Sequence, residues 1–148
     1  MKTLVITFFC LILPFAGTSS ATSIDDAKVF FDRYVRLEQS FDPAVADMYA
    51  EGAFIKNTRI YPTGQVRELT MPANKYKALI RQAMPLAKLR GDTNIYSDIT
   101  FSKEGSLVRI RAMRFSTLKK YSSPISLLVG PDNTGRWLIH EEISESRP

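Results

Sequence analysis

The sequence predicts an α+β domain in which three helices, all assigned to the N-terminal half, pack on a cone-shaped, curved antiparallel sheet. Two observations support this prediction. Apolar residues first recur at helical spacing, and short apolar runs separated by glycine and proline then follow. With 148 residues and 45% hydrophobic content, the chain is long enough to bury a substantial single core. The expected order of elements is ααββαββββ.

The first two helices are predicted from capping residues and apolar spacing. Ser23 and Asp26 have the spacing of a capping box, which marks a helix start. Asp42 and Pro43 supply the cap and first residue of a short second helix over 44–49. Between these two starts runs an apolar stripe of helical spacing: Ala27, Phe30, Phe31, Tyr34, Val35, Leu37 and Phe41.

A third helix is predicted from Pro72 to Gly91, and Pro85 is expected to kink or interrupt it. The other elements are predicted as strands in three pairs, each joined by a turn rich in glycine, proline or small polar residues. Their expected ranges are 54–61 with 65–70, 95–102 with 106–117, and 125–129 with 136–143.

The first residues predict export. A lysine at position 2, an apolar run over 4–15 and small residues ending at Ala21 follow the order of a secretory signal peptide. The apolar run is shorter than the ~20 residues that span a bilayer. We therefore expect a leader over 1–21 and a single mature domain over 22–148, with no transmembrane segment, in a periplasm or the medium. Cys10, the only cysteine, would leave with the leader.

The charge of the chain is modestly basic, at +5. Nucleic-acid binding is disfavoured because the sequence holds no known binding motif and export is expected. Arg109, Arg111, Lys119 and Lys120 are interpreted as a solvated basic face. The functional alternative is contact with anionic lipid or an acidic partner.

Two local segments and the order of elements resemble the nuclear transport factor 2 and ketosteroid isomerase superfamily, including its SnoaL-like branch. Residues 33–53 are similar to the helix pair and the first strand of that family, and residues 135–139 (Gly-Arg-Trp-Leu-Ile) resemble the opening of its last strand. The resemblance covers nearly all of residues 22–148. It implies a sheet that wraps a cone, a small apolar ligand in the open end of that cone, and frequent homodimers through the sheet.

The catalytic residues of the ketosteroid isomerases are largely missing. Tyr34 stands where the resemblance places the tyrosine that binds the developing enolate oxygen. Asn57 stands at or next to the position of the catalytic base, and asparagine cannot accept a proton at working pH. The second acid of the family would fall near Leu127, which is apolar. The resemblance therefore implies the fold but disfavours this activity.

Glu141 and Arg114 are the candidate polar residues inside the cone. Strict alternation along the last strand puts Glu141 on one face with Trp137, Ile139 and Ile143, where an apolar setting should raise the pKa of its carboxyl. Arg114 falls on the apolar face of its own strand and needs a counter-charge, for which Glu141 is the expected partner. A plain salt bridge between Glu141 and a nearby arginine is the alternative. His140, the only histidine, is expected to be solvent-exposed or paired at a strand edge rather than functional.

Catalytic candidates are thus limited to Tyr34 and Glu141, and no metal site or cofactor is expected. The residues predicted to line a ligand pocket are Phe31, Tyr34, Tyr49, Phe54, Asn57, Arg114, Trp137 and Glu141. The leading hypothesis is a non-enzymatic exported domain that binds a small apolar ligand or a protein partner. The first alternative is a SnoaL-like isomerase, cyclase or hydrolase with Glu141 as base and Tyr34 as oxyanion donor. The second is a purely protein-interaction component of the envelope.

Overall fold

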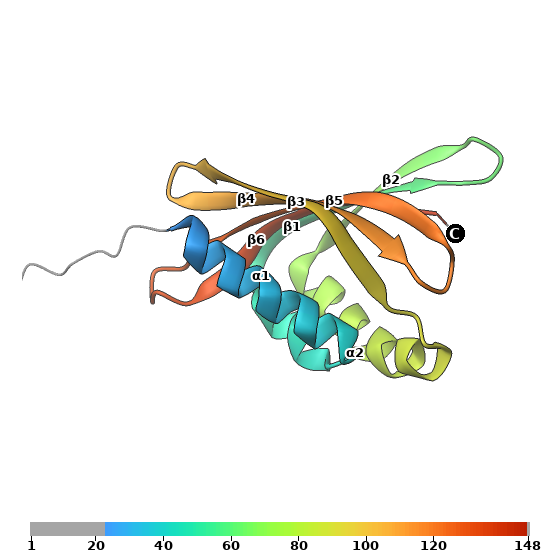
Figure 1. Cartoon of the computed structure of the whole chain (residues 1–148), viewed down its shortest axis with the longest axis horizontal. Coiled ribbons are helices and arrows are strands. Elements are labelled where there is room, and N and C mark those ends of the chain that lie inside the picture. Colours follow the sequence, from blue (N-terminus) through green and yellow to red (C-terminus); the bar gives the residue numbers. More distant parts are fainter. Residues whose placement is uncertain (1–22, 148) are drawn as a thin grey trace, which may run out of the picture.

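The computed structural model describes residues 23–147. The predicted leader and its cleavage site at Ala21 lie outside the described residues. The elements follow one another as helices and strands in the predicted order (Figure 1). Within the described part of the chain, no helix combines the length and apolar character needed to cross a membrane.

Helix α1 covers Ile24–Gln39 and begins with the predicted capping box. The amide of Asp26 donates to the Ser23 hydroxyl at 3.0 Å, and the Asp26 carboxylate accepts from that hydroxyl at 2.6 Å. The second predicted helix is a 3₁₀ helix, η1, over Pro43–Met48, and the Asp42 carboxylate accepts from the amide of Ala44 at 2.8 Å. Both caps satisfy backbone groups that the first turn leaves without partners.

Helix α2 covers Ala73–Arg90 and continues through Pro85, so the expected interruption does not occur. Proline removes one backbone hydrogen bond, the one to the carbonyl of Arg81. Pro85 and Arg81 are both exposed, so water can satisfy that carbonyl. Gly91 ends the helix in the left-handed conformation with φ of 64°, as its position in the sequence predicts.

Six strands form one curved sheet in the order β2-β1-β6-β5-β4-β3. The pairs are antiparallel except for β1 and β6, which run parallel in the interior of the sheet. This arrangement is the predicted α+β class, with a mixed and mostly antiparallel sheet. The strands are β1 (Tyr49–Ile60), β2 (Val66–Pro72), β3 (Asn94–Glu104), β4 (Leu107–Ser116), β5 (Tyr121–Pro131) and β6 (Trp137–Ser146).

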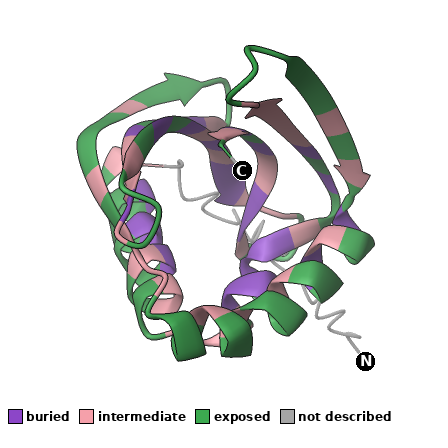
Figure 2. Cartoon of the chain, turned by 90° about the vertical axis from the view of Figure 1, so that its right-hand side faces the viewer, coloured by how far each residue is buried: buried purple, intermediate pink, exposed green. Residues whose placement is uncertain are grey.

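The hydrophobic core lies between the concave face of the sheet and the helices, where Figure 2 shows the buried residues. Helix α1 contributes Ala27, Phe30, Phe31 and Tyr34. The sheet contributes alternating residues that are almost fully buried, among them Val108, Ile110, Leu127, Val129 and Ile139. Helix α2 buries little of its surface, since Ala73 and Lys77 are its only buried residues.

A β-bulge in β6 changes which side chains face the core. Val129 pairs with Ile139 and Leu128 pairs with Glu141, so His140 is the extra residue between two pairs. The His140 ring contacts the carbonyl of Gly130 at 3.1 Å. Because one residue is unpaired, alternation shifts by one position after Ile139. The inward-facing residues beyond the bulge are therefore Glu142 and Ser144, which are 1% and 4% exposed.

Candidate functional site

Glu142 is the most buried charged residue of the described chain and lies inside the cone. Its carboxylate accepts hydrogen bonds from the hydroxyls of Tyr49 on β1 and Tyr76 on α2, the latter at 2.9 Å. The rings of these two tyrosines meet edge to face, with centroids 5.3 Å apart. The two hydroxyls replace water around a carboxylate that would otherwise be costly to bury.

The tyrosines around Glu142 are hydrogen-bond donors at all physiological pH values. Burial, followed by the charge of Glu142, raises the pKa of both Tyr49 and Tyr76 well above the usual range. Burial also raises the pKa of Tyr34, with further contributions from Glu38 and Glu142. Each hydroxyl therefore keeps its proton and can stabilise negative charge nearby.

A second carboxylate, Glu38 on α1, is bound in a similar way at the other side of the cone. It accepts from the Tyr96 hydroxyl at 2.7 Å and from the Asn94 amide nitrogen at 2.7 Å. Burial raises the pKa of Glu38, although the hydrogen bonds from Tyr96 and Asn94 and the charge of Arg114 act against that rise. Burial thus makes this carboxyl a weaker acid than a solvated glutamate.

Arg114 on β4 is the buried cation of this region. Its guanidinium donates to the backbone carbonyl of Glu145 at 3.1 Å. Among residues 23–147, no carboxylate lies within 4.0 Å of its nitrogen atoms. Burial alone would lower the pKa of Arg114, but Tyr96, Tyr34 and Glu142 raise it, so the side chain is charged. A charged guanidinium with few direct partners can donate further hydrogen bonds to an anionic or carbonyl oxygen.

Arg114 lines two cavities. The first, which we call the Glu142 cavity, has a volume of about 290 Å³. It has an apolar wall of Ile55, Leu69, Met71 and Leu79, and its polar lining residues are Asn57, Arg59, Tyr76, Arg114, Glu142, Ser144 and Ser146. The Nε atom of Arg59 is buried and has no hydrogen-bond partner. This cavity is amphipathic, with two guanidinium groups and one carboxylate.

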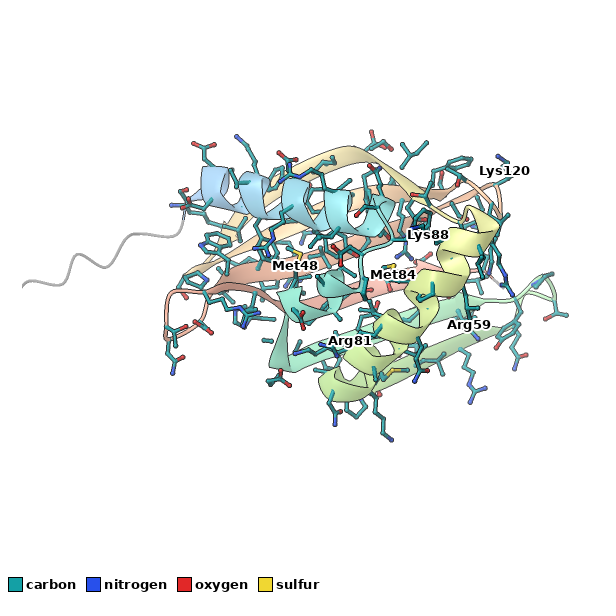
Figure 3. The ribbon with its side chains drawn as sticks, turned by 90° about the horizontal axis from the view of Figure 1, so that it is seen from below. Met48, Arg59, Arg81, Met84, Lys88 and Lys120 are labelled. Atoms are coloured by element: carbon teal, nitrogen blue, oxygen red, sulfur yellow. The ribbon has the colours of Figure 1, made fainter. Side chains whose placement is uncertain are left out.

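The second, which we call the Glu38 cavity, has a volume of about 240 Å³ and lies toward the C-terminal end of α2. Its lining is mostly polar on the sheet side and apolar on the helix side. Met84 is one of the α2 residues in its wall, and Figure 3 shows it on the side of α2 that faces α1. The full lining is Glu38, Phe41, Ala83, Met84, Ala87, Asp92, Asn94, Arg114, Ser116, Lys119, Tyr121 and Ser123.

Three of the residues predicted from the sequence lie at this site. Arg114 and Asn57 both line the Glu142 cavity. The Asn57 amide donates to the Ser144 hydroxyl at 3.1 Å and its carbonyl accepts from Ser146 at 2.7 Å. Tyr49 is fully inside and binds Glu142 through its hydroxyl rather than forming a cavity wall. Tyr34 is also buried and stacks on Phe31.

The expectation that Glu141 faces the interior is wrong. Its carboxylate lies on the convex face and forms an ion pair with Arg109, which also binds Glu104. The bulge at His140 is the cause, since it reverses the alternation that predicted the opposite face. Arg114 and Glu141 therefore do not pair, and Tyr34 and Glu141 do not face a common cavity. The alternative interpretation, a plain salt bridge to a nearby arginine, describes Glu141.

Phe54, Phe31 and Trp137 do not line either cavity. Phe54 is 49% exposed and lies beside Glu141 in the sheet, because β1 turns Ala53 and Ile55 inward instead. Phe31 packs within the core, with its ring against those of Tyr96 and Phe101. Trp137 packs on Phe30 in the N-terminal half of α1, beside a separate hollow of about 130 Å³.

Sequence reasoning missed Glu142, Glu38, Tyr76 and Tyr96. Glu38 lies in the last turn of the amphipathic helix α1, where a carboxylate is usually solvated. Tyr76 lies within the predicted apolar stripe of α2, and no local feature separates a core tyrosine from one that binds a carboxylate. The usable signal was the pair Glu141-Glu142, in which either residue could face inward if the strand carried a bulge.

Comparisons with known proteins support the fold. No family model matches the sequence, and no curated protein matches it. A protein of unknown function from Pseudomonas putida superposes with a TM-score of 0.66 at 11% identity, over 82% of this chain and 84% of that one. A candidate ketosteroid isomerase from Shewanella frigidimarina has a TM-score of 0.59 at 17% identity, over 86% and 97%.

A further solved structure, a candidate dehydratase of the nuclear transport factor 2-like family from Streptomyces avermitilis, has a TM-score of 0.59 at 9% identity, over 82% of this chain and 94% of that one. At such identities the similarity concerns the backbone and not the chemistry of the site. The chain therefore has the nuclear transport factor 2-like fold.

Proposed function

We propose that this domain binds, without chemical conversion, a small ligand that has an apolar body and one anionic group, in the Glu142 cavity. The observation that carries the proposal is Arg114, a buried and charged guanidinium that lines the cavity without a carboxylate in ion-pair contact. An anionic group at this point would give Arg114 a direct ion-pair partner in addition to the more distant charge of Glu142. Leu69, Met71 and Leu79 would contact the apolar body.

Arg59 strengthens the case for an anionic group. It lines the same cavity as Arg114, and its buried Nε has no partner. Two guanidinium groups against one carboxylate leave the cavity wall with an excess of positive charge. Glu142 already accepts two tyrosine hydrogen bonds, so it does not need a ligand donor. A purely apolar ligand would leave both arginines without new partners.

Catalysis by Glu142 is the second candidate, because a carboxylate in a cavity is the minimal requirement for acid–base chemistry. Each oxygen of the Glu142 carboxylate already accepts a hydrogen bond from a tyrosine hydroxyl, so neither oxygen is presented unpartnered to a substrate proton. The tyrosine donors also point at Glu142 rather than into the cavity as an oxyanion site would require. These contacts favour binding over proton transfer.

The binding proposal is tested by calorimetric titration with octanoate and with 1-octanol, which share an apolar chain and differ in the anionic group. We expect octanoate to bind at least tenfold more tightly, since an ion pair in a partly buried site adds more than about 1.4 kcal/mol. Equal affinity for the two probes, or no binding of either, would overturn the proposal.

Two variants locate the site. Arg114→Met should remove the preference for octanoate, while Arg111→Met on the convex face should leave it unchanged. If Arg114→Met does not fold, Leu79→Glu provides an independent test. Leu79 is 48% exposed at the cavity rim, so a carboxylate is tolerated there and should repel octanoate but not 1-octanol. Unchanged octanoate affinity in Leu79→Glu would place binding elsewhere.

We further propose that the protein is exported and that a leader over 1–21 is removed. The support is the order of a basic start, an apolar run and small residues in the sequence. N-terminal sequencing of protein recovered from the periplasm or medium of an expressing bacterium should begin at Thr22. Recovery in the cytoplasm with an intact N-terminus would contradict export.

A homodimer through the convex face of the sheet is proposed as the partner arrangement. This face carries a hollow of about 460 Å³ whose wall includes Arg111, Met113, Pro124, Ile143 and Glu145. Ile143 is 39% exposed at the centre of the sheet, and a second copy would cover it. Sedimentation velocity should detect a dimer that Ile143→Arg dissociates, and a monomer at all concentrations would refute it.

A further inference from the structure

Helix α2 has an unusual distribution of residues around its axis. Its inner side carries Tyr76, Ile80 and Met84, which pack against the core. Its outer side carries a second apolar stripe, in which Leu86 and Leu89 are 56% and 84% exposed. Ala78 and Pro85 on the same side are exposed as well. A surface helix normally presents polar residues to water, so this outer stripe is an unpartnered apolar face.

The charge of α2 is of one sign. The helix contains no acidic residue, and its charged residues are Lys75, Lys77, Arg81, Lys88 and Arg90. In the N-terminal half of the helix, Lys77 pairs with Glu51 of β1 and Arg81 pairs with Asp47 of η1. Among residues 23–147, Lys75, Lys88 and Arg90 have no carboxylate within ion-pair distance. At the C-terminal end of α2, the exposed Leu89 is therefore flanked in the chain by two exposed cations, Lys88 and Arg90.

The turn between β4 and β5 extends this surface at the C-terminal end of α2. The Thr117 hydroxyl donates to the carbonyl of Thr93 at 2.9 Å and lies 3.5 Å from the carbonyl oxygen of Gly91, which holds the turn against the end of the helix. Lys119 and Lys120 are exposed there, and Leu118 is 44% exposed. Figure 3 shows Lys88 and Lys120 at the same end of the molecule.

We propose that the outer face of α2, together with residues 118–120, docks on an anionic lipid bilayer. We call this the α2 surface and define it by Leu86, Leu89, Lys88, Arg90 and residues 118–120. Amphipathic helices that lie in a bilayer interface combine apolar side chains with flanking lysine and arginine in this way. Anionic headgroups attract each cation, and the leucines insert below them.

A second copy of the chain fits this surface less well than a bilayer does. A symmetric dimer through α2 would bring Lys88 and Arg90 of one copy against the same cations of the other. No acidic residue of α2 is available to offset that repulsion. The binding cavity proposed above is not required for docking, so the two proposals can fail separately.

Vesicle sedimentation tests the docking proposal. The test uses the chain that the proposed removal of the leader would leave, beginning at Thr22, so that the apolar run over 4–15 cannot itself enter the lipid. We expect this chain to sediment with vesicles of phosphatidylcholine and phosphatidylglycerol and to remain soluble with phosphatidylcholine alone. Raising the salt from about 0.1 to 0.5 M should release it, because screening weakens attraction to headgroups.

Two double variants separate the charged and apolar contributions. Lys88→Glu with Arg90→Glu should weaken partitioning by about 30-fold or more, since each cation near an anionic surface contributes. Leu86→Ser with Leu89→Ser should weaken it by about tenfold or more. All four side chains are exposed in the free protein, so neither variant should impair folding, which circular dichroism checks.

The matched control is Lys28→Glu with Lys103→Glu, which makes the same charge change at the other end of the molecule. Figure 1 shows the start of α1 and the β3–β4 hairpin opposite the C-terminal end of α2. This control should retain at least a third of the wild-type partitioning. Equal loss in the control, equal binding to neutral vesicles, or no binding to either would overturn the proposal. Binding to poly-L-glutamate without binding to vesicles, or a dimer that only the leucine variant dissociates, would overturn it as well.

Discussion

Glu141 and Glu142 are neighbours on β6, yet the two faces of that strand give them opposite surroundings. On the convex face, Glu141 pairs with Arg109 in contact with solvent. On the concave face, Glu142 is 1% exposed and is bound by Tyr49 and Tyr76. The comparison shows that the fully buried carboxylate is satisfied by neutral tyrosine hydroxyls, whereas the partly exposed carboxylate pairs with a cation. It also predicts very different consequences of changing either residue.

The largest effect is expected for Glu142→Ala. It would leave two buried tyrosine hydroxyls without an acceptor and Arg114 without a nearby anion, at a cost of about 3 kcal/mol or more in the free energy of unfolding. Glu141→Ala should cost about 1 kcal/mol or less, because Arg109 keeps its ion pair and both hydrogen bonds with Glu104. Urea denaturation of both variants measures the difference. Equal losses would show that the two carboxylates are energetically alike.

A triple variant sharpens the same comparison. Replacing Glu142 by leucine while changing Tyr49 and Tyr76 to phenylalanine removes both donors and their acceptor together. Because no buried polar group of that network is then unsatisfied, we expect recovery of about 1–2 kcal/mol relative to Glu142→Ala. A triple variant less stable than Glu142→Ala would mean that the tyrosine hydroxyls have other essential partners.

The next effect is a pH dependence of opposite sign on the two faces. Burial raises the pKa of Glu38 inside the cone, so its stabilising contribution is present below its usual pKa of 4.5 and is lost as pH rises through the raised value. Hydrogen bonds from Arg109 lower the pKa of Glu104 on the convex side, so its contribution is present above 4.5 and is lost as pH falls.

Denaturation of Glu38→Gln and Glu104→Gln between pH 3.5 and 7 tests both signs. The stability of wild type relative to Glu38→Gln should fall as pH rises above 4.5. The stability of wild type relative to Glu104→Gln should fall as pH drops below 4.5. Slopes of the same sign for the two variants would remove the distinction between the faces.

The smallest effect is expected for Arg109→Ala. The side chain of Arg109 is 11% exposed, but its partners Glu104 and Glu141 are 40% and 24% exposed, so water can replace the guanidinium around both carboxylates. We therefore expect a cost of about 1 kcal/mol or less in the free energy of unfolding. We expect a small loss of stability at about 0.02 M salt that disappears near 1 M. A large, salt-independent loss would show that the Arg109 side chain acts through packing.

The sequence predicted the fold more completely than the site. Element order follows from local signals, such as the Ser23 capping box and the glycine at position 91, and these act over a few residues. Arg114 was placed correctly because β4 alternates without interruption from Val108 to Arg114. Glu142 was not, because the bulge at His140 depends on how β5 and β6 pair, and pairing is a property of two segments.

The partners of Glu142 illustrate a second limit. Tyr49 lies on β1 and Tyr76 on α2, so their convergence depends on the packing of a helix against two strands. No spacing within one element reports such a contact. The parallel pairing of β1 with β6 is of the same kind, since strand direction within a sheet is decided by the topology of the whole chain.

That parallel pairing also has a consequence for how the chain matures. Strand β6, over Trp137–Ser146, joins β1 on one side to β5 on the other. The β1–β2 hairpin and the β3–β4–β5 meander therefore share no strand contact until β6 is in place. During synthesis the sheet cannot close before Trp137–Ser146 has been made, although all its other strands already exist. Removal of β6 alone would leave two separate pieces of sheet.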